Sequence, residues 1–204
     1  MSNLIMLLAA LAALQGTEPR FEGRFTGETR AALEAIVQSA RDAGLPTEPL
    51  VQRALEGASR RAEPARIVAV VRSLGERLRN ARSALGPNAS EGELVAGASA
   101  LYVGVDAGAL ERMRRARAGG SVAVPLVLLV DIIERGVPRD TAAALITSLS
   151  DPRVRDADYM TLRQSIVSDI QSGVSPAAAA SARARGVLVT RGLPEPQLPA
   201  VRTP

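Results

Sequence analysis

The densest group of side chains with binding chemistry in this 204-residue sequence is a run of arginines near its middle. Within six residues lie four guanidinium groups, those of Arg112, Arg114, Arg115 and Arg117. A guanidinium group can hold a phosphate or a carboxylate through two parallel hydrogen bonds, so this run is a candidate site for an anion, an anionic lipid or another protein. Charge runs on short helices are usually solvated, so the alternative is an exposed helix face. In either case we expect these side chains to point mostly outward.

Carboxylates are the main acid–base candidates. Asp131 and Glu134 lie three residues apart in the most apolar stretch after the N-terminal region, where burial could raise a carboxyl pKa. Asp156 and Asp158 lie near a predicted helix start, where capping and the helix dipole are sufficient explanations for acidic residues. The pattern favours structural roles for all four.

The sequence lacks three residue types on which most catalysis depends. It has no cysteine, no histidine and no lysine, and all 25 basic residues are arginine. Thiolate, imidazole and Schiff-base chemistry are therefore excluded, and we predict no catalytic, cofactor-binding or metal-binding residues. The net charge of +4 is modest and aromatic residues make up 2% of the chain, so no nucleic-acid partner is expected.

Glycine followed by an apolar residue recurs between the helical patterns that must position these side chains. Gly44, Gly104, Gly136 and Gly173 each follow a helix-like run and precede another, at spacings of 60, 32 and 37 residues. Glycine tolerates the left-handed conformation that ends a helix in a Schellman turn. The sequence therefore predicts an all-α fold of about eight helices in antiparallel hairpins. Both a bundle and a short α-solenoid of 32–37-residue repeats fit this pattern.

Two segments give the sharpest local predictions. Ser90 and Glu93 form a Ser-x-x-Glu capping box, which predicts a helix from there to Val103. The aliphatic run 122–133 predicts a central helix buried on most sides. Other predicted helices cover 26–43, 63–85 and 142–149, and short ones follow Gly44 and Gly104. A longer helix marked by Tyr159 and Ile170 stops at Gly173, and an Ala-rich final helix opens at Ser175-Pro176.

The two ends differ in composition from the rest of the chain. Residues 4–14 are an unbroken apolar run, too short to span a bilayer, which predicts a cleaved signal peptide over 1–16; an N-terminal core helix is the alternative. We interpret 17–27 as a linker whose two phenylalanines dock on the domain, 28–186 as the helical domain and 187–204 as a Pro-rich disordered tail.

The segment from Glu56 to Ile67, together with Gly44-Leu45-Pro46, resembles uncharacterised exported α-helical proteins of Gram-negative bacteria. These share the order Glu-Gly, basic residue, Pro and Ile. The resemblance implies export to the periplasm or secretion, and it implies no activity.

Four functional hypotheses follow, the last of which is a cytoplasmic nucleic-acid binder that is viable only if residues 1–16 are retained. The first is a non-enzymatic binding or scaffold protein of the bacterial envelope, whose partner is another envelope protein or anionic lipid. The second is a carrier of apolar ligands or lipids, with a pocket between helices near 122–133. The third is a carboxylate-dependent hydrolase, which the absence of histidine disfavours.

Overall fold

The computed structural model describes residues 17–195, and in this range the chain consists of helices joined by turns and short loops. Residues 17–195 contain nine α-helices, one 3-10 helix and no strand, which confirms the predicted all-α class. None of the helices in this range is both long enough and apolar enough to cross a membrane. The predicted signal peptide, 1–16, lies outside the described residues, as does 196–204 of the predicted tail.

The described chain divides into two compact units, 17–79 and 80–195, where the sequence predicts a single helical domain. The first unit contains a 3-10 helix η1 (Pro19–Phe21), α2 (Gly27–Asp42), α3 (Glu48–Ser59) and most of α4 (Pro64–Leu85). The predicted linker is packed onto this unit. Phe21 is fully buried with its ring edge against Phe25, at a centroid distance of 5.3 Å, and Arg20 forms a two-pronged ion pair with Glu48 at the start of α3.

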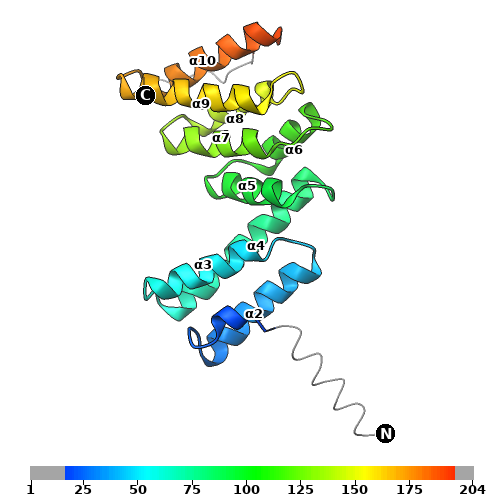
Figure 1. Ribbon diagram of the computed structural model, residues 1–204, viewed down its shortest axis with the longest axis vertical. Helices are drawn as coiled ribbons and strands as arrows, with labels where there is room; N and C mark the ends of the chain where they lie inside the picture. Colours follow the sequence, from blue (N-terminus) through cyan, green and yellow to red (C-terminus); the bar gives the residue numbers. More distant parts are fainter. Residues whose placement is uncertain (1–16, 196–204) are drawn as a thin grey trace, which may run out of the picture. The chain divides into compact units, whose positions relative to one another are not determined.

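The second unit consists of the end of α4 and three helical hairpins. Its helices are α5 (Glu91–Tyr102), α6 (Ala107–Ala116), α7 (Ala123–Glu134), α8 (Arg139–Leu149), α9 (Asp156–Gln171) and α10 (Pro176–Arg191). In this unit α5 contacts α7 and α7 contacts α9, while α6 contacts α8 and α8 contacts α10. The first helices of the hairpins thus form one layer and the second helices another, stacked in chain order (Figure 1). This two-layer stack is the arrangement expected of a short α-solenoid.

Each predicted glycine marks the turn between the first and the second helix of a hairpin. Gly44, Gly104, Gly136 and Gly173 have φ between +63° and +95°. In every case the amide of the next residue bonds to a carbonyl five residues earlier, at 2.9–3.0 Å, as in Leu45 to Ala40. These are the bonds of a Schellman turn, so the prediction is confirmed at all four positions.

Arg61 ends α3 in the same kind of turn without a glycine. Its φ is +54°, and Ala62 donates to the carbonyl of Gly57. A non-glycine residue in this left-handed conformation destabilises the folded state by roughly 1–2 kcal/mol. Glycine avoids this strain, but it also makes the unfolded chain more flexible, which offsets part of the gain. We expect Arg61→Gly to stabilise the first unit by about 0.5–1 kcal/mol in chemical denaturation followed by circular dichroism. The matched control is Arg60→Gly at φ −83°, which should destabilise the same unit.

The C-terminal helix extends further than the sequence predicts. The predicted tail begins at 187, but α10 continues to Arg191 and ends in a further left-handed glycine, Gly192. Leu188 is fully buried, and this burial holds the last turn of α10 on the second unit. Gly186 is therefore an interior helical residue.

Candidate functional site

The structure does not bring the four predicted arginines together on one surface. Arg112 and Arg115 are exposed on α6, where they pair with Asp106 at 3.8 Å and Glu111 at 3.4 Å. Arg114 is partly buried, and Arg117 is only 7% exposed, so the prediction of an outward-facing side chain is wrong for Arg117. The physical reason is a set of buried acceptors that the local sequence does not reveal.

Arg117 lies where the segment after α6 meets the loop between α8 and α9. Its guanidinium group donates to the carbonyls of Ser121, Asp151 and Val154 at 2.6–3.1 Å and to the carboxylate of Asp156 at 3.0 Å. It also lies 5.4 Å from the ring centroid of Tyr159, within the range of a cation–π contact. Arg117 thus has a structural role, because its hydrogen bonds connect the segment after α6 to the loop between α8 and α9.

Arg114 belongs to a second buried network, centred on Glu93. The Glu93 carboxylate accepts hydrogen bonds from the backbone amides of Ser90 and Val122, each at 2.8 Å, and from Arg114 at 3.0 Å. Arg114 also donates to the carbonyl of Gly120. The predicted capping box at Ser90 and Glu93 is confirmed. Burial alone would raise the pKa of Glu93, but the two backbone amides and the charge of Arg114 outweigh it, so the pKa is lowered.

Tyr159 is buried deep in the same interior, beside Arg117. The ring is 1% exposed and its hydroxyl donates to the carbonyl of Leu149. Burial raises the pKa of Tyr159 to about 12, even though the nearby charge of Arg117 opposes the shift.

A pH titration should detect this shift. The folded pKa of Tyr159 exceeds its unfolded value near 10, so its contribution to stability is complete below pH 10 and is lost as the pH rises through about 12. The chain has no tryptophan and only two tyrosines, so ultraviolet absorbance of a Tyr102→Phe variant follows Tyr159 alone. Tyrosinate formation near pH 10 in the folded variant would contradict the burial of this ring.

Three of the four carboxylates that the sequence offered for acid–base chemistry, all but Glu134, are held in ion pairs. Asp131 accepts two bonds each from Arg135 and Arg163, at 3.0–3.1 Å. Burial would raise the pKa of Asp131, but these hydrogen bonds and charges outweigh it, and the pKa is lowered. The expected upward shift is therefore absent. Asp156 pairs with Arg117, and Asp158 accepts from the Arg155 amide and pairs with Arg191.

Because these carboxylates are paired with arginines, they are poor candidates for hydrolytic catalysis or for binding a metal ion. Within residues 17–195, no three histidine, cysteine, aspartate or glutamate residues are grouped as a metal ion would require. The inner face of 122–133 is packed against the protein, because Leu126, Leu129 and Ile132 are at most 1% exposed, so a pocket beside this helix can open only on its outer face. Neither finding favours the hydrolase or the carrier hypothesis.

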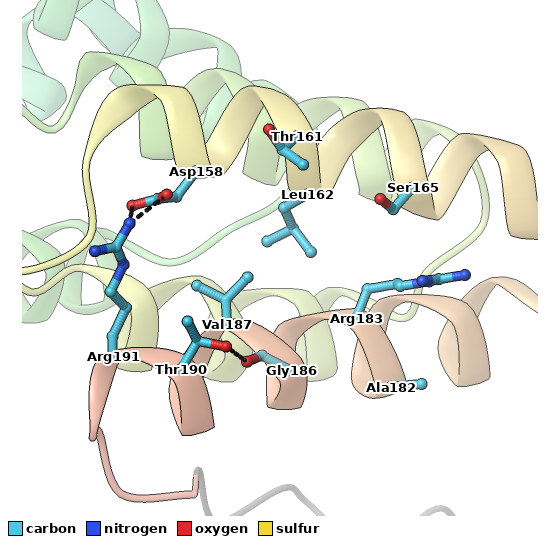
Figure 2. Close-up of a pocket in the computed structure, with 10 residues that line it drawn as sticks. All are labelled: Asp158, Thr161, Leu162, Ser165, Ala182, Arg183, Gly186, Val187, Thr190 and Arg191. Atoms are coloured by element: carbon cyan, nitrogen blue, oxygen red, sulfur yellow. Dashed lines mark hydrogen bonds and ion pairs between the residues drawn. The ribbon is translucent and has the colours of Figure 1, made fainter.

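A polar hollow of about 340 Å³ lies between α9 and α10 (Figure 2). Two arginines line it, and both are neutralised by aspartates. Arg191 is bonded to Asp158 at 2.6–2.7 Å, and Arg183 is bonded to Asp169 at 2.6–2.7 Å. With its cations paired, this hollow is poorly suited to an anionic ligand.

The layer formed by α5, α7 and α9 carries exposed apolar side chains beside a hollow. Val127 and Met160 are 56% and 53% exposed, and a hollow of about 490 Å³ opens between α5 and α7. Val95, Val127 and Val130 line that hollow, together with Ala96 and the polar residues Ser99, Asp131 and Glu134. We call the three residues Val95, Val127 and Met160 the apolar stripe.

The exposure of Val127 departs from the sequence prediction, which has α7 buried on most sides. The prediction holds for the residues around it, since Leu126, Leu128, Leu129 and Ile132 are buried. The repeat offset is the signal that identifies the stripe. Val127 follows Val95 by 32 residues and precedes Met160 by 33, while the starts of α5, α7 and α9 are separated by 32 and 33 residues. The three residues therefore occupy equivalent positions in successive hairpins.

The chain matches no protein-family model, no curated protein sequence and no solved structure. Function must therefore be argued from the site itself.

Proposed function

We propose that this protein is a non-enzymatic binding protein, and that the α5/α7/α9 layer binds a segment of another protein. The observation that supports this most is the repetition of apolar residues at equivalent positions of successive hairpins, half-buried at Val95 and exposed at Val127 and Met160, which forms the apolar stripe. Single exposed apolar residues are ordinary on a protein surface. Contiguous apolar surface beside a hollow is typical of interaction sites, and stacked helical repeats commonly bind along one face.

The neighbouring polar groups agree with binding better than with chemistry. Asp131, which borders the α5/α7 hollow, is neutralised by Arg135 and Arg163. A general base or acid needs a pKa close to the working pH, and the pKa of Asp131 is shifted away from it.

We also propose that the protein is exported to the bacterial envelope. The support is the apolar run 4–14, whose length fits the core of a signal peptide, and the resemblance of 44–67 to exported helical proteins. The mass of the purified full-length product, expressed with a C-terminal tag in a Gram-negative host, tests this. Cleavage between Ala12 and Gly16 with recovery from the periplasm is the expected result. An intact cytosolic product would refute export and leave the binding proposal standing.

The absence of cysteine allows a site-specific test of binding. A Val127→Cys variant labelled with a photoreactive maleimide should cross-link a partner from a periplasmic extract, whereas the same probe on exposed Val189 should not. An excess of unlabelled chain should compete the product away, and an excess of the Val127→Asp chain should not. Equal capture at both positions, or equal competition by both chains, would refute the proposed surface.

A further inference from the structure

The apolar stripe crosses α5, α7 and α9 at equivalent positions along the three helices. The Asp131–Arg163 ion pair joins α7 and α9 at 3.1 Å, four residues after Val127 and three after Met160. On the inner side, Leu94, Leu126 and Tyr159 are all buried and follow the same offsets of 32 and 33 residues. The stripe therefore runs across the helices, with one apolar side chain from each.

The spacing along this stripe matches a helical ligand. Packed helices lie about 8–10 Å apart, so successive stripe residues are separated by roughly that distance. Residues i and i+7 of an α-helix are about 10.5 Å apart along its axis and lie on nearly the same face. A helix with apolar residues at heptad spacing can thus place one of them near each stripe residue, as amphipathic helices do in apolar grooves.

The charges beside the stripe indicate which net charge the ligand should carry. Glu91 lies one helical turn before Val95, and Glu134 lines the α5/α7 hollow. Both are exposed, and neither takes part in an ion pair within residues 17–195, whereas Asp131 is matched by two arginines. Two carboxylates without an ion-pair partner among residues 17–195 thus lie beside the first two helices of the stripe, although the whole chain is basic, with a net charge of +4.

We propose that the occupant of this surface is a basic amphipathic helix of a partner protein, which lies across α5, α7 and α9. Its heptad-spaced apolar residues contact Val95, Val127 and Met160, and its arginine or lysine side chains pair with Glu91 and Glu134. The inference rests on the proposed function, because it specifies the chemistry of the segment that the same surface binds. Like-charged segments are disfavoured by the two glutamates, which gives the surface selectivity as well as attraction.

Three fluorescent 21-residue peptides and the purified full chain test this inference. The first peptide is an amphipathic helix with leucines at heptad spacing and arginines on its flanks. The second replaces each arginine with glutamate, and the third has the composition of the first in scrambled order. Fluorescence anisotropy should show micromolar binding of the first peptide and at least tenfold weaker binding of the other two. Glu134→Arg should weaken the first peptide and strengthen the second.

The protein variants separate the possible failures. Val127→Asp should weaken the basic peptide at least tenfold, and Val189→Asp, at an exposed valine on α10, should leave it within twofold. If the acidic or the scrambled peptide binds at least as well, with the same dependence on Val127, the surface binds segments but the inferred chemistry is wrong. If no peptide binding depends on Val127 and no partner cross-links there, the proposed function fails as well. Self-association of the chain that Val127→Asp abolishes would assign the surface to a second copy and overturn the inference.

Discussion

Glu93→Ala is expected to destabilise the second unit by about 3–5 kcal/mol, because it leaves buried donors without an acceptor. The side chain of Glu93 is 4% exposed, and its carboxylate joins the start of α5, the side chain of Arg114 and the amide of Val122 before α7. Both tyrosines lie in the second unit, so tyrosine fluorescence during guanidinium denaturation follows that unit selectively.

Two further substitutions make this result interpretable. Glu93→Gln keeps the shape but places an amide group against a backbone donor, so it should cost about 2 kcal/mol, less than alanine. Glu91→Ala removes an exposed carboxylate two residues away and should change stability by less than about 0.5 kcal/mol. Equal stabilities for Glu93→Ala and Glu91→Ala would contradict the buried network.

Acid should weaken the same network. The folded pKa of Glu93 is below its ordinary value, so its contribution to stability is present above the unfolded pKa and is lost as the pH falls through the folded pKa. The stability difference between wild type and Glu93→Gln should therefore shrink on acidification.

Arg117→Ala should have a comparable effect, a loss of about 3–5 kcal/mol, because three carbonyls lose a buried charged donor and Tyr159 loses its cation–π contact. Arg117→Lys should restore only a minor part of this loss, since a single ammonium group cannot reach all the acceptors that the planar guanidinium group contacts. The same denaturation experiment measures both variants.

The matched control for Arg117 is Arg115→Ala. Arg115 lies on the same helix with its side chain 68% exposed, and its ion pair with Glu111 is a surface pair of little value. Its removal should change stability by less than about 0.5 kcal/mol. A similar loss for Arg115 and Arg117 would contradict the structural role of Arg117.

Local rules were sufficient for the turns and caps. The Schellman turns at Gly44, Gly104, Gly136 and Gly173 follow from glycine's conformational freedom, and the capping box at Ser90 and Glu93 follows from a four-residue pattern. These features depend on neighbours along the chain, which a sequence displays directly.

Long-range partners are what the sequence did not reveal. Arg117 is buried because carbonyls 34 and 37 residues further along the chain meet it, and Glu93 accepts from an amide 29 residues away. No local pattern distinguishes Arg117 from the exposed Arg115, and the capping box predicts the contact of Glu93 with Ser90 but not its contacts with Arg114 and Val122. Val127 is a different case, because the 32-residue offset to Val95 is visible in the sequence once the hairpin repeat is aligned.

The most direct test of the proposed binding surface is the affinity of the cross-linked partner, once purified, for stripe variants of this protein. Val127→Asp and Met160→Asp change exposed residues on two different helices, so both variants should keep the wild-type tyrosine fluorescence transition. The proposal predicts that each weakens partner binding at least tenfold, while Val189→Asp stays within twofold of wild type. Undiminished binding by both stripe variants, or an equal loss in Val189→Asp, would contradict it.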